Sequence, residues 1–147
     1  MTKLILHIPH SSDKMPNKIG YVDNKNIIEN EILKLTDWYT DDLFSCDDSI
    51  VVRADFSRIF CDAERFSNDK QEVMAKFGMG VLYERTDDGS LLRTVNNELR
   101  SNVLDGFYWP HHEKLTQEVE QQLKLNKKAL IIDCHSFTSN PLVRDLD

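Results

Sequence analysis

The chain has 147 residues, a length that suits one domain with a single core, and we expect one domain over residues 1–147. Its formal net charge is -7, which argues against nucleic acid or an anionic membrane as a partner, because both require a basic surface. The apolar run after Lys3 is too short for a signal peptide, and no run approaches the roughly 20 residues that span a bilayer, so we expect a cytoplasmic protein.

The first part of the chain predicts two strands around a helical segment. Leu4–Ile8 is a nearly continuous apolar run that ends at Pro9, a pattern typical of a strand buried on both faces. Across residues 24–44, apolar residues recur at helical spacing, which predicts one helix or two helices with a break near Thr36. Residues 49–54 form the second predicted strand.

The second part predicts further elements of the same kinds. Residues 80–83 predict a third strand, which ends at the turn signal Asp-Asp-Gly of residues 87–89. A long helix is predicted from about residue 108 to 125, with Pro110 in its first turn and Leu115, Val119 and Leu123 on its inner face. Residues 129–134 predict a buried central strand. Strands that alternate with helices indicate an α/β sheet covered by helices.

Two histidines each follow the carboxyl end of a predicted strand. His10 follows the first predicted strand, and His135 follows the last. Ligands of open α/β sheets bind at this edge, where strand ends and loops converge. Two histidines and a carboxylate, with one position open for water, make up a catalytic zinc site. Each histidine alone can equally be a loop cap, so the two are candidates as a pair.

Four further residues are open to more than one interpretation. His7 lies opposite its apolar neighbours on the strand, and we expect it in a buried, hydrogen-bonded pocket. Asp133 lies on the same side of its strand as His135, so it either orients that imidazole or bonds a helix terminus. Asp37 and Asp41 are each candidates for an acidic ligand, but the first can be a helix cap and the second a solvated charge. Spacing alone does not choose between them.

Five fragments of the chain occur in the same order as in one hydrolase family. They are His7-Ile-Pro-His10-Ser-Ser, Thr36-Asp37-Trp38, Ser57-Arg58-Ile-Phe-Cys-Asp62-Ala-Glu64-Arg65-Phe66, Trp109-Pro110-His111-His112 and Asp133-Cys-His135-Ser136-Phe137. Together they resemble the N-formylglutamate amidohydrolase family, over residues 4 to about 142. Residues 78–83 also look like a signature of this family.

The resemblance implies a fold, a metal and a reaction. The fold would be α/β, in three α/β/α layers around a mixed, largely parallel sheet, as in zinc-dependent exopeptidases and aspartoacylases. A zinc ion (Zn2+) would be held by His10, Asp37 and His135. The enzyme would hydrolyse the formamide bond of N-formyl-L-glutamate, or of a similar small anionic N-acyl amino acid, and release formate and glutamate.

The resemblance also assigns substrate-binding and catalytic residues. Arg58 and Arg65 match paired arginines that would hold substrate carboxylates through planar, two-pronged hydrogen bonds, although surface ion pairs are the ordinary role of arginine. His112 would stabilise the tetrahedral intermediate or protonate the leaving amine, unless it only fills the core. Asp133 would orient a ligand imidazole. His111 points about 100° away from His112 on a helix, and we expect it to be exposed.

The chain departs from the family in length. Members of the family are considerably longer, whereas this sequence ends soon after His135, so we expect a domain that is shortened at its C-terminus. The general base is left open among Asp62, Glu64 and Asp133. We also expect one unprotected edge of the sheet, with either homo-oligomerisation or a tail after Pro141 that covers it.

Two other classes of function compete with this interpretation. Another metal-dependent hydrolase, such as a different N-acyl amino acid deacylase or a two-metal phosphoesterase, is the alternative among enzymes. The pair Asp133 and His135 resembles the start of a phosphoesterase site, but such sites need several more His and Asn ligands, and the five histidines of this chain leave little to spare. The alternative outside enzymes is a non-catalytic family member that binds zinc or a carboxylate.

Overall fold

A parallel three-stranded sheet lies at the centre of the described chain, and the computed structural model describes residues 2–139. The strands are β1 (Leu4–Ile8), β2 (Ile50–Arg53) and β3 (Leu130–Asp133), in the order β2-β1-β3. In the register of the sheet, Ile5 pairs with Ile50 on one side and with Ile131 on the other. The three predicted strands at residues 4–8, 49–54 and 129–134 therefore form, and the fold class α/β is confirmed.

The two predicted helical regions form in the described chain, and three further helical segments between them were not predicted. They are α1 (Lys25–Leu35), α2 (Thr40–Leu43), the 3₁₀ helix η1 (Val73–Phe77), α3 (Asn97–Val103), the π-helical segment η2 (Leu104–Tyr108) and α4 (Trp109–Asn126). Asn24 caps α1 by accepting the N–H of Ile27, and α1 ends where Thr36 adopts an extended conformation. Of the two predicted alternatives for residues 24–44, the one with two helices and a break near Thr36 is thus confirmed. No helix of residues 2–139 is long and apolar enough to cross a membrane.

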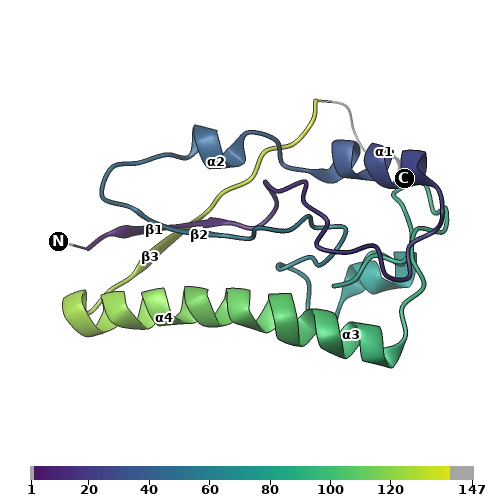
Figure 1. The fold of residues 1–147 in the computed structure, drawn as a ribbon. Helices are drawn as coiled ribbons and strands as arrows, with labels where there is room; N and C mark the ends of the chain where they lie inside the picture. The colour runs from purple at the N-terminus through teal and green to yellow at the C-terminus, as the bar shows by residue number, and fades with distance from the viewer. Residues whose placement is uncertain (1, 140–147) are drawn as a thin grey trace.

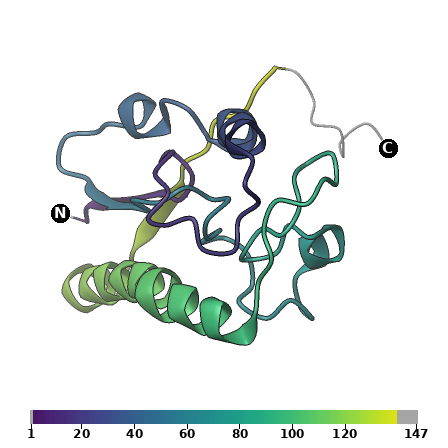
Figure 2. The ribbon, with the colours of Figure 1, turned by 45° about the vertical axis from the view of Figure 1, so that its right-hand side comes forward.

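Helices lie on both sides of the sheet. α4 packs against β1 and β2, and α1 and α2 lie on the opposite side of the strands in two views (Figure 1, Figure 2). The sheet among the described residues is wholly parallel, where a mixed sheet was expected. The three-layer arrangement and the likeness to zinc exopeptidases stay predictions.

β3 is at the edge of the described sheet, so its prediction as a central strand is wrong. The central strand is β1, whose Ile5 and Ile8 are completely buried. All four residues of β3 are exposed, and Ile131 keeps 43% of its surface accessible. An apolar run shows that a segment can be buried, but it carries no information on the spatial order of the strands. The expectation of an unprotected edge therefore holds for the described residues, whereas the tail after Pro141 lies outside them.

Residues 80–83 are buried without forming a strand, so this prediction is also wrong. Met79 and Tyr83 make only an isolated antiparallel bridge around a tight turn. The segment is buried because it wraps Asp62: the carbonyl of Val81 accepts the N–H of Asp62 at 2.8 Å, and the Tyr83 hydroxyl donates to its carboxylate. The turn predicted at residues 87–89 does form, and Gly89 supplies the required positive φ of 86°.

The inner face of α4 differs from the predicted one. The long helix forms with Pro110 in its first turn, but its buried residues are His111 and Gln122, while the predicted Leu123 is 45% exposed. Leu115 and Val119 are half-buried. Polar contacts decide the orientation, because Gln122 accepts the backbone N–H of Lys3 and His111 contacts β1. A pattern of apolar residues does not record such pairings.

Candidate functional site

The candidate site lies at the carboxyl ends of β1 and β3. His10 and His135 each follow the end of their strand by two residues, and the two strands are parallel neighbours. Asp37 comes from the turn between α1 and α2. Its backbone N–H donates to the carbonyl of His10 at 3.0 Å, so the turn is fixed to the loop that carries this histidine.

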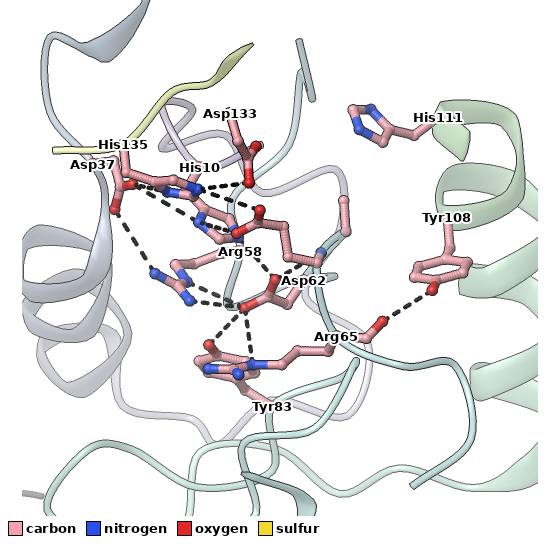
Figure 3. Close-up of polar contacts among 12 residues, drawn as sticks. His10, Asp37, Arg58, Asp62, Arg65, Tyr83, Tyr108, His111, Asp133 and His135 are labelled. Atoms are coloured by element: carbon pink, nitrogen blue, oxygen red, sulfur yellow. Dashed lines mark hydrogen bonds and ion pairs between the residues drawn. The ribbon is translucent and has the colours of Figure 1, made fainter. Parts of the chain in front are cut away.

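Three ligand-type side chains converge in this place. The ligand atoms of His10, Asp37 and His135 all lie within 4.8 Å of one another. Nδ1 of His135 is 2.8 Å from Oδ2 of Asp37, and Nδ1 of His10 is 3.8 Å from the same oxygen. Figure 3 shows the three side chains pointing toward a common point. The structure therefore brings together all three residues that sequence analysis selected as metal ligands.

The tautomer of His10 is set by Asp62. Nε2 of His10 lies 2.8 Å from Oδ1 of Asp62, and an ionised carboxylate only accepts hydrogen bonds, so Nε2 carries the proton. Nδ1 then presents a lone pair, and it has no hydrogen-bond partner among the described residues although only 2% of His10 is exposed. Burial also lowers the pKa of His10, which keeps the ring neutral. A buried, neutral nitrogen aimed at a carboxylate and a second histidine fits a divalent metal ion.

Asp62 is a fully buried acceptor for several donors. Besides His10, it accepts hydrogen bonds from Arg58 at 3.3 and 3.0 Å, from the hydroxyl of Tyr83 at 2.8 Å and from the backbone N–H of Glu64 at 3.1 Å. Burial by itself raises the pKa of Asp62, but Arg58 and His10 hold it well below its ordinary value. Asp62 is therefore a permanent anion that positions its neighbours, and it is not available as a general base.

The two candidate substrate-binding arginines differ in their engagement. Arg58 directs two nitrogens at Asp62 and a third, at 3.8 Å, at Asp37. Arg65 lies 3.6 Å from Asp62 and 3.7 Å from Glu72, and its buried Nε has no hydrogen-bond partner among residues 2–139. The side chain of Arg65 is also more exposed, 24% against 14% for Arg58. Arg65 is thus the more accessible and the less tightly paired of the two arginines.

Two further carboxylates lie beside the convergent group, which consists of His10, Asp37 and His135. Glu64 places Oε1 3.2 Å from Nε2 of His135 and Oε2 3.5 Å from Nδ1 of His10. Asp133 places Oδ2 3.4 Å from Nε2 of His135. Burial and the nearby Asp133 raise the pKa of Glu64 to about 7. Burial alone lowers the pKa of His135, but its bond to Asp37 and the charges of Glu64 and Asp133 raise it.

The importance of Glu64 was missed in the sequence, where it was one of three candidates for a general base. A usable signal was available in the spacing of the fragment that ends at Phe66. Glu64 follows Asp62 by two residues, and Asp62 bonds the backbone N–H of Glu64 directly. Asp62 contacts Nε2 of His10, and through this backbone hydrogen bond it places Glu64 beside Nδ1 on the other side of the ring.

His7 and His111 form a contact between the sheet and α4. Nδ1 of His7 is 2.7 Å from Oδ1 of Asp133, and its Nε2 is 2.9 Å from Nε2 of His111. The expected buried, hydrogen-bonded environment of His7 is therefore observed. The expectation that His111 is exposed is wrong, because it is 6% exposed and packs on His7. Burial and the neighbouring His7 lower the pKa of His111 to about 4, so this ring is neutral.

His112 is directed at the backbone and not at the convergent group. Its Nε2 is 2.8 Å from the carbonyl of Ala63, and its ring packs against the ring of Tyr108 in a tilted arrangement with centroids 4.3 Å apart. The hydroxyl of Tyr108 in turn donates to the carbonyl of Arg65, as Figure 3 shows. His112 and Tyr108 therefore hold the segment that carries Glu64 and Arg65 in place.

Comparison with known proteins identifies the family. A model of the N-formylglutamate amidohydrolase family matches residues 2–145. The chain belongs to the N-formylglutamate amidohydrolase family. The resemblance found in the sequence is thereby confirmed, and the match contains every residue of the convergent group.

The fold is also similar to a solved N-formylglutamate amidohydrolase. The crystal structure of this enzyme from Ralstonia eutropha JMP134 aligns with a TM-score of 0.79 at 18% sequence identity, and the alignment covers 96% of this chain. The chain spans 60% of the length of that protein. A comparison with curated protein sequences found no significant match. This similarity therefore shows that the chain has the same fold as that enzyme over most of its length.

Proposed function

We propose that this chain hydrolyses the formamide bond of N-formyl-L-glutamate, or of a similar N-acyl amino acid, with the aid of a zinc ion. The family supplies the reaction and the class of substrate. The observation that supports a metal ion is the buried Nδ1 of His10, which has no hydrogen-bond partner among the described residues and faces Asp37 beside His135. His10, Asp37 and His135 would hold the ion.

The chemistry of the donor set agrees with zinc. Two imidazoles and one carboxylate leave a coordination position open, as catalytic zinc sites require. When bound, zinc lowers the pKa of a coordinated water to around 7 and polarises the substrate carbonyl. Asp62 would orient this donor set without touching the ion, because it keeps the proton of His10 on Nε2 and leaves the lone pair of Nδ1 available.

In the proposed reaction, the oxygen of water forms a bond to the formyl carbon and the C–N bond breaks. Glutamate leaves as the amine and takes up a proton, and formate is the second product. The proton released by water must pass through a nearby carboxylate. Glu64 and Asp133 border the metal ligands and have no arginine or lysine partner among residues 2–139, whereas Asp62 is saturated by donors. In the arrangement with a single zinc ion, we assign proton transfer to this pair.

Substrate carboxylates require a guanidinium at the edge of the site. Arg65 is the better candidate, because its contacts with Asp62 and Glu72 are long, at 3.6 and 3.7 Å, and its side chain is the more exposed of the two. Arg58 would serve mainly to neutralise Asp62 and Asp37. His112, to which the family resemblance gives a role in the reaction, would instead position the segment of Ala63.

The deciding experiment combines metal analysis with an assay of formate release. The chain is stripped of metal, reloaded with zinc and incubated with N-formyl-L-glutamate and, separately, with N-acetyl-L-glutamate. We expect zinc-dependent release of formate, and its loss in His135→Ala. Bound zinc without turnover of either compound would indicate a non-catalytic binding protein. Preferential turnover of the acetyl compound would indicate a different deacylase.

A further inference from the structure

A second group of ligand-type side chains adjoins the first. His7, Glu64 and Asp133 also offer ligand atoms within 4.8 Å of one another. His7 and Asp133 are cross-strand partners in the register of β1 and β3, so the sheet itself places them side by side. Glu64 reaches them from the segment that Asp62 holds through a backbone hydrogen bond. None of these three residues belongs to the donor set proposed above.

The histidine of this group is built into the fold. The side chain of His7 is 8% exposed, with Nδ1 2.7 Å from the carboxylate of Asp133. Its Nε2 is in contact with Nε2 of His111, which lies on the facing side of α4. A ring held on both sides in this way has one orientation, so its nitrogen faces the two carboxylates without a loss of side-chain entropy on binding.

The carboxylates of this group face only histidines in the described structure: His7 and His135 contact Asp133, and His10 and His135 contact Glu64. Among residues 2–139, no lysine or arginine forms an ion pair with Glu64 or Asp133. The two nearby guanidiniums are engaged elsewhere, Arg58 by Asp62 and Asp37, and Arg65 by Asp62 and Glu72. Two adjacent carboxylates repel each other unless a proton or a cation lies between them.

We propose that His7, Glu64 and Asp133 bind a second divalent cation, next to the zinc ion of the proposed function on which this inference rests. Imidazole and carboxylate ligands suit zinc and related divalent metals. Glu64 and Asp133 both contact His135, so the two groups share a border. Where two ions lie side by side in a hydrolase, both can contribute to stabilising the attacking oxygen of water. The competing arrangement is one ion with a proton shared by the two carboxylates.

The two arrangements differ in the number of ions bound. Metal-free protein is saturated with zinc, desalted and analysed by mass spectrometry for zinc per chain. Because the exposed thiol of Cys46 can itself bind zinc, all measurements use a Cys46→Ser background. We expect two zinc ions per chain in this background, and one in His7→Asn. The matched control Asp105→Asn, at an exposed carboxylate of η2, should retain two.

A second variant guards against misfolding of the first. If circular dichroism shows that His7→Asn is unfolded, Asp133→Asn is analysed in its place, and it should also bind one ion. One zinc ion per chain in the background protein, still one in the folded variant and none in His135→Ala, would overturn the second site but leave the proposed function intact. Two ions without any hydrolysis of formyl or acetyl glutamate would overturn the function but leave the second site.

Discussion

His10 and Asp62 contact each other through Nε2 and Oδ1 at 2.8 Å, and neither side chain is open to solvent. This contact determines which nitrogen of His10 faces Asp37. The same carboxylate also accepts hydrogen bonds from Arg58 and Tyr83, and these contacts stabilise its negative charge in the protein interior. One buried carboxylate thus supports the fold and fixes the orientation of His10, the proposed metal ligand.

Replacement of Asp62 should therefore damage stability and metal binding together. In Asp62→Asn, Arg58 loses its main partner while it stays buried, and breaking such a pair costs about 3–5 kcal/mol. Loss of a carboxylate behind a ligand histidine should weaken zinc affinity by about 10–100-fold. Urea unfolding and zinc titration measure the two effects. Asp55→Asn is the control, because its ion pair with Arg53 is on the surface. Unchanged zinc affinity in a folded Asp62→Asn would contradict this role.

Asp37, and not Asp41, should be the acidic ligand. Asp37 shares its Oδ2 with His10 and His135, whereas Asp41 pairs with Arg53 at 2.9 Å on the surface. We expect Asp37→Ala to lose zinc at neutral pH by more than the roughly 10–100-fold of an indirect contact. Asp41→Ala should keep the zinc content of the unchanged chain. Equal zinc content in both variants would rule out the assignment.

Arg65 should act on substrate binding through its planar fork of donors. Truncation of one buried charge-assisted contact costs roughly 2–5 kcal/mol, so Arg65→Ala should raise KM strongly. Arg65→Lys should restore only part of the affinity, because an ammonium group lacks the two-pronged geometry. Steady-state kinetics with N-formyl-L-glutamate separate KM from kcat. Full rescue by lysine, or an effect confined to kcat, would speak against carboxylate recognition.

Glu31 should make stability depend on pH far from the site. It is buried and accepts the N–H of Asp87 at 2.6 Å, and burial raises its pKa. The folded protein therefore holds this proton more tightly than the unfolded chain. The free energy of unfolding should fall as pH rises from about 4.3, the unfolded value, through the raised folded pKa.

The variant Glu31→Gln removes this titration. Its stability should lack the decrease that the unchanged chain shows in that pH range, as measured by urea unfolding at a series of pH values. Glu29→Gln, at an exposed position paired with Lys25, is the matched control and should keep the decrease. The same pH profile in all three proteins would disprove the contribution of Glu31.

The exposed edge of β3 should promote association of the chain with itself. Its backbone pairs with β1 on one side only among the described residues, and its apolar side chains are accessible. Light scattering should therefore show a mass that increases with concentration, and Ile131→Lys should reduce it. Leu33→Lys, a similar change at an exposed position of α1, should not. A monomer at all concentrations would refute the prediction.

Sequence reasoning succeeded where local pattern and strand direction carry the information. Apolar runs identified three strands, and the rule that parallel strands end at one edge placed His10 and His135 together. The break near Thr36 and the Pro110 start of α4 follow from the preferences of the backbone. The family resemblance then chose Asp37 over Asp41, a choice that spacing left open.

The remainder depended on contacts between distant segments. That β1 is central and β3 marginal is a matter of strand order, which hydrophobicity does not encode. His111 faces the sheet because His7 offers it a partner across 104 positions of sequence. Arg58 and Arg65 are equivalent in the sequence, yet only Arg58 both hydrogen-bonds Asp62 and faces Asp37.

The position of the donor set has a mechanical consequence. His10 follows β1, the first strand, and His135 follows β3, the last described strand. Closing a loop of this length costs the unfolded chain entropy, and an ion that binds only the folded form stabilises it by mass action. The exposed β3 would gain most, because its other attachment is a short ladder to β1. Zinc would act in this fold as a removable cross-link that holds its weakest strand in register.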